Sequence, residues 1–267
     1  MKLAVCEFPD ERSRMDGAWE ALRAALANER PEVLVMPEMP FCSWIFAAPV
    51  FDEAAWHEAL CNHDRMIDRL PALGVPWLIS SRPIEQDGRR LNEAFVWSRQ
   101  DGYRGLRCKW YLPDAAVARE TTWFHQGDRQ FVPTEVAGAR IGVQLCSEAM
   151  YPELARVLGA KGAQIVAQPR AGTSHRLWSV ATEMSAVSSG CFIATANRRT
   201  FEKDWFAGGS TIISPDAETL AKTTVDRPLV TATIDLASAD QAAQKYPRSL
   251  YRLYRDTDPH ADGTRTS

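Results

Sequence analysis

Short apolar segments recur along the whole chain, and most of them are rich in β-branched or aromatic residues, which is typical of buried strands. These segments are Leu3 to Phe8, Val33 to Met36, Trp77 to Ser80, Leu91 to Trp97, Ile141 to Leu145, Gln164 to Ala167, Phe192 to Thr195, Ser210 to Ile213 and Leu229 to Ile234. A chain with this many buried strands needs apolar partners on the faces of its sheets.

Helical patterns lie between several of the strand segments and supply such partners. Their apolar faces comprise Trp19, Leu22 and Leu26 in the first helix, Leu154, Val157 and Leu158 in the second, and Leu177, Val180, Met184 and Val187 in the third. Strands that alternate with helices predict an α/β fold in which helices cover sheet. Periodicity leaves open whether one sheet is covered on both sides or two sheets are stacked.

The chain of 267 residues has no linker rich in Pro, Gly or Ser, so we expect a single domain over residues 1–255 and a polar tail over residues 256–267. The formal net charge is −3 and the basic residues are dispersed, which predicts neither nucleic acid nor an anionic membrane as a partner. The first apolar run is broken by Glu7 and Pro9, and no segment approaches the length of a membrane span.

The six cysteines show no CxxC spacing and no disulfide framework, which favours free thiols and a cytoplasmic protein. Cys61 and His63 lie close together, but no second Cys/His pair accompanies them, so we expect no metal site. Cys146 differs from the other cysteines because an apolar run ends there and a polar, helix-starting stretch follows. Backbone N–H groups at a helix start stabilise a thiolate, so the position predicts a nucleophile, with a buried apolar cysteine as the alternative.

Two further ionisable residues stand among apolar or aromatic neighbours. Glu38 ends the run that begins at Val33, and loss of water around a carboxyl raises its pKa toward that of a general base. A glutamate at a sheet edge facing water is the alternative. Lys109 would stabilise a thiolate or an oxyanion if it pointed inward, whereas a lysine directed to solvent would do neither.

Four motifs in a common order resemble those of the nitrilase, or carbon–nitrogen hydrolase, superfamily. They are Pro37-Glu38 after the second strand, Lys109 with Leu112 three residues on, Glu120-x-x-Trp123-Phe124-x-x-Gly127, and Gly142-x-x-x-Cys146 leading to Tyr151-Pro152-Glu153. Segments farther on, such as Ala196-Asn197-Arg198, extend the resemblance to nearly the whole chain.

This resemblance implies a four-layer αββα sandwich of the nitrilase-like type with Glu38, Lys109 and Cys146 as the catalytic set. It also implies that Glu120 positions Lys109 and the substrate. Glu38 would take the thiol proton, Cys146 would attack an amide carbonyl, and Lys109 with the Ser147 N–H would hold the oxyanion. Water would then hydrolyse the thioester without a metal or an organic cofactor. We therefore expect an amidase that releases ammonia or an amine from a small-molecule amide or N-carbamoyl amide.

The residues after the nucleophile leave the substrate open. Ser147-Glu148 stands where many amidases have Tyr-Asp or His-Asp and nitrilases have Trp-Glu, so a true nitrilase is an alternative, although the compact length favours an amidase. Ser147 and Glu148 are also candidate substrate contacts. Arg170 is either a fork for a substrate carboxylate or a structural arginine paired with an acid such as Glu148.

Aromatic residues supply candidates for a pocket wall and for an interface. Candidates for the pocket, each with core packing as its alternative, are Phe41, Trp44, Trp110, Tyr111 and Trp205. The stretch from Tyr246 to Arg255 is rich in tyrosine and arginine, and the resemblance implies a homodimer or a larger homo-oligomer.

Two other functions compete with the amidase. A Cys–His hydrolase would use His125 or His175 as its base, but neither histidine stands in a recognisable context. A catalytically idle, ligand-binding member of the same fold would have lost a catalytic residue, and this chain has lost none.

Overall fold

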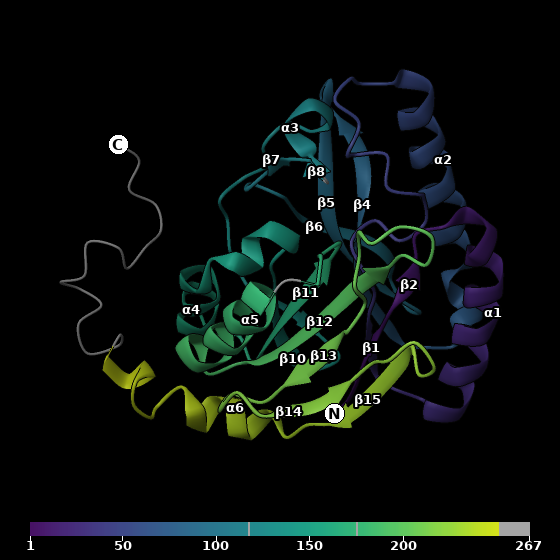
Figure 1. The fold of residues 1–267 in the computed structure, drawn as a ribbon. Helices are drawn as coiled ribbons and strands as arrows, with labels where there is room; N and C mark the ends of the chain where they lie inside the picture. Colours follow the sequence, from purple (N-terminus) through teal and green to yellow (C-terminus); the bar gives the residue numbers. More distant parts are fainter. Residues whose placement is uncertain (117, 175, 251–267) are drawn as a thin grey trace, which may run out of the picture.

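The computed structural model describes residues 1–116, 118–174 and 176–250 and contains two large sheets stacked face to face (Figure 1). The first sheet consists, in spatial order, of β15 (Leu229–Thr233), β1 (Lys2–Cys6), β3 (Val33–Val35), β4 (Trp77–Gln86), β5 (Arg89–Ser98) and β6 (Gly102–Cys108). The second consists of β14 (Thr219–Lys222), β13 (Thr211–Ile213), β12 (Phe192–Arg199), β11 (Ile165–Arg170), β10 (Ala139–Val143) and β9 (Thr134–Val136), with β2 (Phe8–Pro9) paired to β12.

Side chains alternate along the strands and so build cores on both faces of each sheet. In β1, Leu3 and Val5 belong to the core between the two sheets, whereas Ala4 and Cys6 belong to the core under helix α1 (Arg12–Glu29). The segment from Leu3 to Cys6 is therefore apolar at every position, because both faces of this strand are covered.

Helices form the two outer layers (Figure 1). Helices α1 and α2 (Glu53–Arg69) cover the first sheet, and α4 (Pro152–Ala160) and α5 (Arg176–Ser189) cover the second. The Asp52 side chain caps α2 by accepting a hydrogen bond from Ala55 N. The four layers confirm the αββα sandwich and settle that two sheets are stacked. Smaller elements are η1 (Leu70–Leu73), the paired β7 (Asp114–Ala115) and β8 (Ala118–Arg119), and α6 (Leu236–Ala242).

The apolar face expected on the third helix does not cover the sheet. On α5, Leu177, Val180 and Met184 are 58%, 46% and 50% exposed. Small residues form the buried face instead, namely Ala181, Thr182, Ser185, Ala186 and Ser189. They suit a close approach to α4, because a Cβ atom on Gly159 would lie only 2.3 Å from the Ser189 carbonyl oxygen. The expectation was wrong since large apolar side chains do not fit this contact.

Each expected strand segment coincides with a strand, and the omissions have a common cause. Strands β6, β9 and β14 carry many charged or exposed residues, so no apolar run marks them.

No helix of the described residues is long and apolar enough to cross a membrane. The domain boundary at residue 255 and the polar segment 256–267 stay predictions, because they lie outside the described residues.

Candidate active site

The carboxyl ends of strands bring the candidate residues together. Strands β3 and β4 run parallel in the first sheet, and β10 and β11 run parallel in the second. Glu38 lies three residues after β3, Cys146 lies three residues after β10, and Lys109 directly follows β6. Ligands of α/β sheets commonly bind at such carboxyl ends, so residues remote in sequence can share one site here.

Lys109, Glu38 and Glu120 form a buried cluster of charges. Lys109 Nζ donates hydrogen bonds to Glu38 Oε1 and to both carboxylate oxygens of Glu120, each at 2.8 Å. Glu120 begins the short helix α3 (Glu120–Trp123), and all three side chains have no exposed surface. Lys109 therefore points inward, and the carboxylates of Glu38 and Glu120 together hold its ammonium in place.

The two oxygens of Glu38 are not equivalent. Oε1 accepts from Lys109 and also from Asn92 Nδ2 at 2.8 Å. Oε2 is buried and has no hydrogen-bond partner among the described residues. Glu38 is thus held through one oxygen while the other is free to accept a proton, which excludes the alternative of an edge glutamate facing water.

Cys146 stands at a sharp turn between β10 and the 3₁₀-helix η2 (Cys146–Met150). Its φ of 43° lies in the left-handed region, which is rare for a residue with a Cβ atom and recurs at catalytic turns. The side chain is 6% exposed, and the backbone N–H of Ala171 hydrogen-bonds to it. The turn fixes the direction of the sulfur within the buried site.

The electrostatics of the site make Cys146 a thiol at rest. Burial and the negative charge of Glu38 raise the pKa of Cys146 well above its ordinary value, and Lys109 only partly opposes them. This differs from the thiolate expected at a helix start, because loss of water and two carboxylates outweigh the backbone N–H groups. The nucleophile accordingly needs a base.

In this cluster the pKa values of both Lys109 and Glu120 are raised. Burial by itself lowers the pKa of Lys109, but Glu120 and Glu38 outweigh it and raise that pKa above its ordinary value. Burial, reinforced by the charge of Glu38, raises the pKa of Glu120 to about 8 despite the opposing effect of Lys109. Near neutral pH, Lys109 is therefore charged and Glu120 readily takes up a proton.

The Glu148 carboxylate is hydrogen-bonded to protein groups on both of its oxygens. Its fully buried carboxylate accepts from Arg107 Nη1 at 2.6 Å and Nη2 at 2.9 Å. It also accepts from the backbone N–H groups of Trp110 at 2.9 Å and Leu145 at 2.8 Å. This placement favours a structural role, which fixes η2 and hence Cys146, over the substrate contact expected from the sequence.

Ser147 and Tyr111 are joined to each other beside the nucleophile. The Ser147 hydroxyl donates a hydrogen bond to the Tyr111 carbonyl oxygen, and the Tyr111 ring stacks on Tyr151 with centroids 4.5 Å apart. The Ser147 N–H lies in the first turn of η2, where helix N–H groups have no intrahelical acceptor. The backbone of Ser147, more than its side chain, is therefore available to a substrate oxygen.

Arg170 ends β11 next to the catalytic residues. Its carbonyl oxygen accepts from Glu38 N at 3.3 Å, and the residue after it is Ala171, which contacts Cys146. Its side chain makes no ion pair with Glu148, which is paired with Arg107 instead. The structural arginine that pairs with Glu148 is therefore Arg107 and not Arg170.

The aromatic candidates divide between core and pocket. Phe41 packs edge-on against Phe8 and Trp19 in the core under α1. Trp44 and Trp205 line a surface pocket of about 470 Å³ together with Trp123. This pocket includes none of Glu38, Lys109, Glu120 or Cys146.

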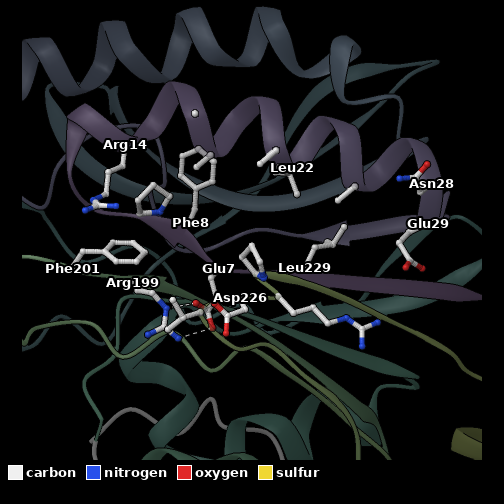
Figure 2. A pocket seen from close by; sticks show the side chains of 18 residues that line it. Glu7, Phe8, Arg14, Leu22, Asn28, Glu29, Arg199, Phe201, Asp226 and Leu229 are labelled. Atoms are coloured by element: carbon white, nitrogen blue, oxygen red, sulfur yellow. Dashed lines mark hydrogen bonds and ion pairs between the residues drawn. The ribbon is translucent and has the colours of Figure 1, made fainter.

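A larger cavity, of about 690 Å³, also lies away from the charge cluster. Figure 2 shows it beside α1, with Phe8, Leu22 and Leu229 in its wall and Arg14 at one end. It contains no catalytic candidate. The candidate active site is therefore identified by the buried charges and hydrogen bonds around Lys109 and not by the volume of a cavity.

Several partners of the site were not anticipated. Asn92 holds Glu38, and Arg107 holds Glu148. Arg198, fully buried, donates to the carbonyl oxygens of Glu38 and Met39. An asparagine inside an apolar strand was the available signal for Asn92, since Asn is depleted in strands.

Of the two competing bases, the structure describes His125. His125 is exposed, and its Nδ1 accepts from Arg90 N at 3.0 Å. His175 lies outside the described residues. Among the residues that are described, no three His, Cys, Asp or Glu side chains are grouped to hold a metal ion.

Comparisons with known proteins identify the family of the chain. The model of a protein family described as carbon-nitrogen hydrolase matches residues 8–244. The chain is 30% identical to an ω-amidase (NIT2-A) of Xenopus laevis, over 94% of this chain and 97% of that protein.

Solved structures share the fold. A carbon-nitrogen hydrolase of Helicobacter pylori G27 superposes with a TM-score of 0.82 at 21% identity, covering 96% of this chain and 98% of that one. A mutant amidase of Nesterenkonia sp. AN1, whose active-site cysteine carries the acetamide moiety of fluoroacetamide, superposes with a TM-score of 0.74 at 20% identity, covering 95% and 96%.

Proposed function

Because the chain belongs to the carbon–nitrogen hydrolase family and is a thiol-dependent hydrolase of non-peptide carbon–nitrogen bonds, we propose that Cys146, Glu38, Lys109 and Glu120 carry out the reaction on a small-molecule amide. One observation carries this assignment of roles. Glu38 Oε2 is buried and free, while Oε1 is fixed by Lys109 and Asn92. A base with one fixed and one free oxygen can accept the thiol proton without losing its position.

In the acylation step, the Cys146 proton passes to Glu38 Oε2 as the sulfur attacks the carbonyl carbon. The C–S bond forms while the carbonyl π electrons move to oxygen, giving a tetrahedral oxyanion. The Lys109 ammonium and the Ser147 N–H stabilise that oxygen. Glu38 then returns its proton to the departing nitrogen, the C–N bond breaks, and a Cys146 thioester remains.

In the deacylation step, Glu38 takes a proton from water, whose oxygen attacks the thioester carbonyl. The C–S bond then breaks, the acid leaves, and Glu38 passes its proton to the Cys146 sulfur. Glu120 acts on Lys109: it accepts hydrogen bonds from the ammonium and so keeps that group beside Glu38. Because the thiol pKa is raised, proton transfer to Glu38 accompanies attack and does not precede it.

The experiment is a panel of small amides, N-carbamoyl amines and nitriles assayed for ammonia release. We expect release from amides, and a mass increase equal to the acyl group on the peptide that contains Cys146. Cys146→Ala should abolish both signals. Full hydrolysis by Cys146→Ala, or acylation of another cysteine, would exclude Cys146 as the nucleophile.

We also propose that the protein is a homodimer. The support is that two apolar side chains one turn apart on α5, Val180 and Met184, are 46% and 50% exposed, and adjacent exposed apolar side chains are typical of contact surfaces. A cytoplasmic location is supported by all six cysteines being free thiols, as a reducing compartment would keep them.

A further inference from the structure

Among the described residues, every buried arginine except one has a carboxylate partner. In the described part of the chain, the buried arginines are Arg107, Arg170, Arg198 and Arg248. Arg107 pairs with Glu148, Arg198 with Asp10, and Arg248 with Asp216. Arg170 is 6% exposed and has no carboxylate within ion-pair distance among these residues.

The hydrogen bonds of the Arg170 guanidinium are also incomplete. Nη1 donates to Thr182 Oγ1 at 3.3 Å, and Nε is buried without a partner. The guanidinium lies 5.1 Å from the ring of Trp178, which supports it on one side. An uncompensated buried charge is costly, so a group in this state is expected to bind an anion.

The position of Arg170 ties that anion to the reaction. The Arg170 carbonyl holds the backbone of Glu38, and the neighbouring Ala171 N–H holds Cys146. Burial lowers the pKa of Arg170 to about 10, so the guanidinium is still charged at neutral pH. An anion bound at this guanidinium would therefore lie at the strand end that also holds the backbone of Glu38 and the Cys146 sulfur.

We propose that Arg170 binds a carboxylate of the substrate, and that the substrates are short acidic amides in which the carboxylate lies a few atoms from the scissile carbonyl. A guanidinium presents parallel N–H donors that match the two oxygens of a carboxylate. Two kinds of compound carry this chemistry: monoamides of short dicarboxylic acids and N-carbamoyl amino acids. The assignment deepens the proposed function and rests on the same site.

The test measures binding without turnover, so that it stands apart from the proposed hydrolysis. In a Cys146→Ala background, calorimetry compares succinamate and glutaramate with N-carbamoylglycine and with neutral butyramide. We expect the acidic compounds to bind and butyramide to bind far more weakly. The acidic class that binds with the lower Kd identifies whether the substrate is a monoamide of a dicarboxylic acid or an N-carbamoyl amino acid.

Replacing Arg170 by Met in that background retains volume while it removes the charge. We expect Kd for the acidic compounds to rise at least about 30-fold, equivalent to about 2 kcal/mol, with no change for butyramide. Arg170→Lys keeps the charge but loses the fork and should give an intermediate Kd. Circular dichroism and thermal melts establish that each variant folds.

Equal weakening of acidic and neutral compounds by Arg170→Met would overturn the proposal, as would acidic and neutral compounds binding equally well to the Cys146→Ala protein. Failure of the hydrolytic function has a different signature. It would appear as absent ammonia release in the wild-type protein, with the dependence of carboxylate binding on Arg170 unchanged.

Discussion

Replacing Glu148 by Ala should destabilise the protein more than any loss of surface charge could. The carboxylate is fully buried and accepts four hydrogen bonds, two from the Arg107 guanidinium and two from backbone N–H groups. The substitution leaves that guanidinium, only 5% exposed, without a counter-charge. It also leaves the Leu145 N–H, immediately before the nucleophile, without its acceptor.

The size of the effect follows from burial. Removing one member of a buried ion pair costs about 3 to 5 kcal/mol, whereas exposed pairs contribute at most about 1 kcal/mol. For a protein of this size, 1 kcal/mol corresponds to a shift of roughly 2 to 4 °C in Tm, so Glu148→Ala should lower Tm by roughly 6 to 20 °C. The kcat should fall as well, because η2 carries Cys146.

Urea unfolding of a double-mutant cycle gives the measurement. Arg107→Met and Glu148→Ala are compared with the double variant, which has no unpaired charge at this position. We expect the double variant to lose less stability than the sum of the single losses, by about 1 to 3 kcal/mol. Additive losses would refute the reasoning. A raised KM with unchanged stability in Glu148→Ala would instead assign Glu148 to the substrate.

Three further outcomes are expected. Between about pH 4.5 and about pH 8 the folded protein keeps a proton on Glu120 that the unfolded chain releases, so wild-type stability should fall as pH rises through this window. Glu120→Gln should flatten that fall in Tm, and an identical pH dependence would contradict the raised pKa. Asn92→Ala should lower kcat about tenfold or more with little change in KM, because Glu38 loses a donor that orients it; a purely structural Asn92 would leave kcat per folded molecule intact. Light scattering should give a dimer for the wild type and a monomer for Val180→Asp/Met184→Asp, and a monomeric wild type would exclude this interface.

The strands and the layers that cover them were predictable, because the apolar pattern of a segment shows which of its faces are buried. Strand segments such as Val33 to Met36 are apolar on both faces, which required covering layers on both sides of each sheet. The outward row of α5 was not predictable in the same way. The inner face of that helix is set by how closely α4 approaches, and small residues give no apolar signal.

By itself the sequence determined the α/β class and, through four motifs in order, which residues to examine as base, cation and nucleophile. Only the tertiary structure decided their states. It placed two carboxylates beside a buried thiol, so that Cys146 rests protonated and depends on the free oxygen of Glu38. It also paired Glu148 with Arg107, and among the described residues it placed no carboxylate within ion-pair distance of Arg170. Such partnerships join residues far apart in the chain, 71 positions for Lys109 and Glu38 and 41 for Arg107 and Glu148, and neither motif nor periodicity reports the contacts that packing creates over those separations.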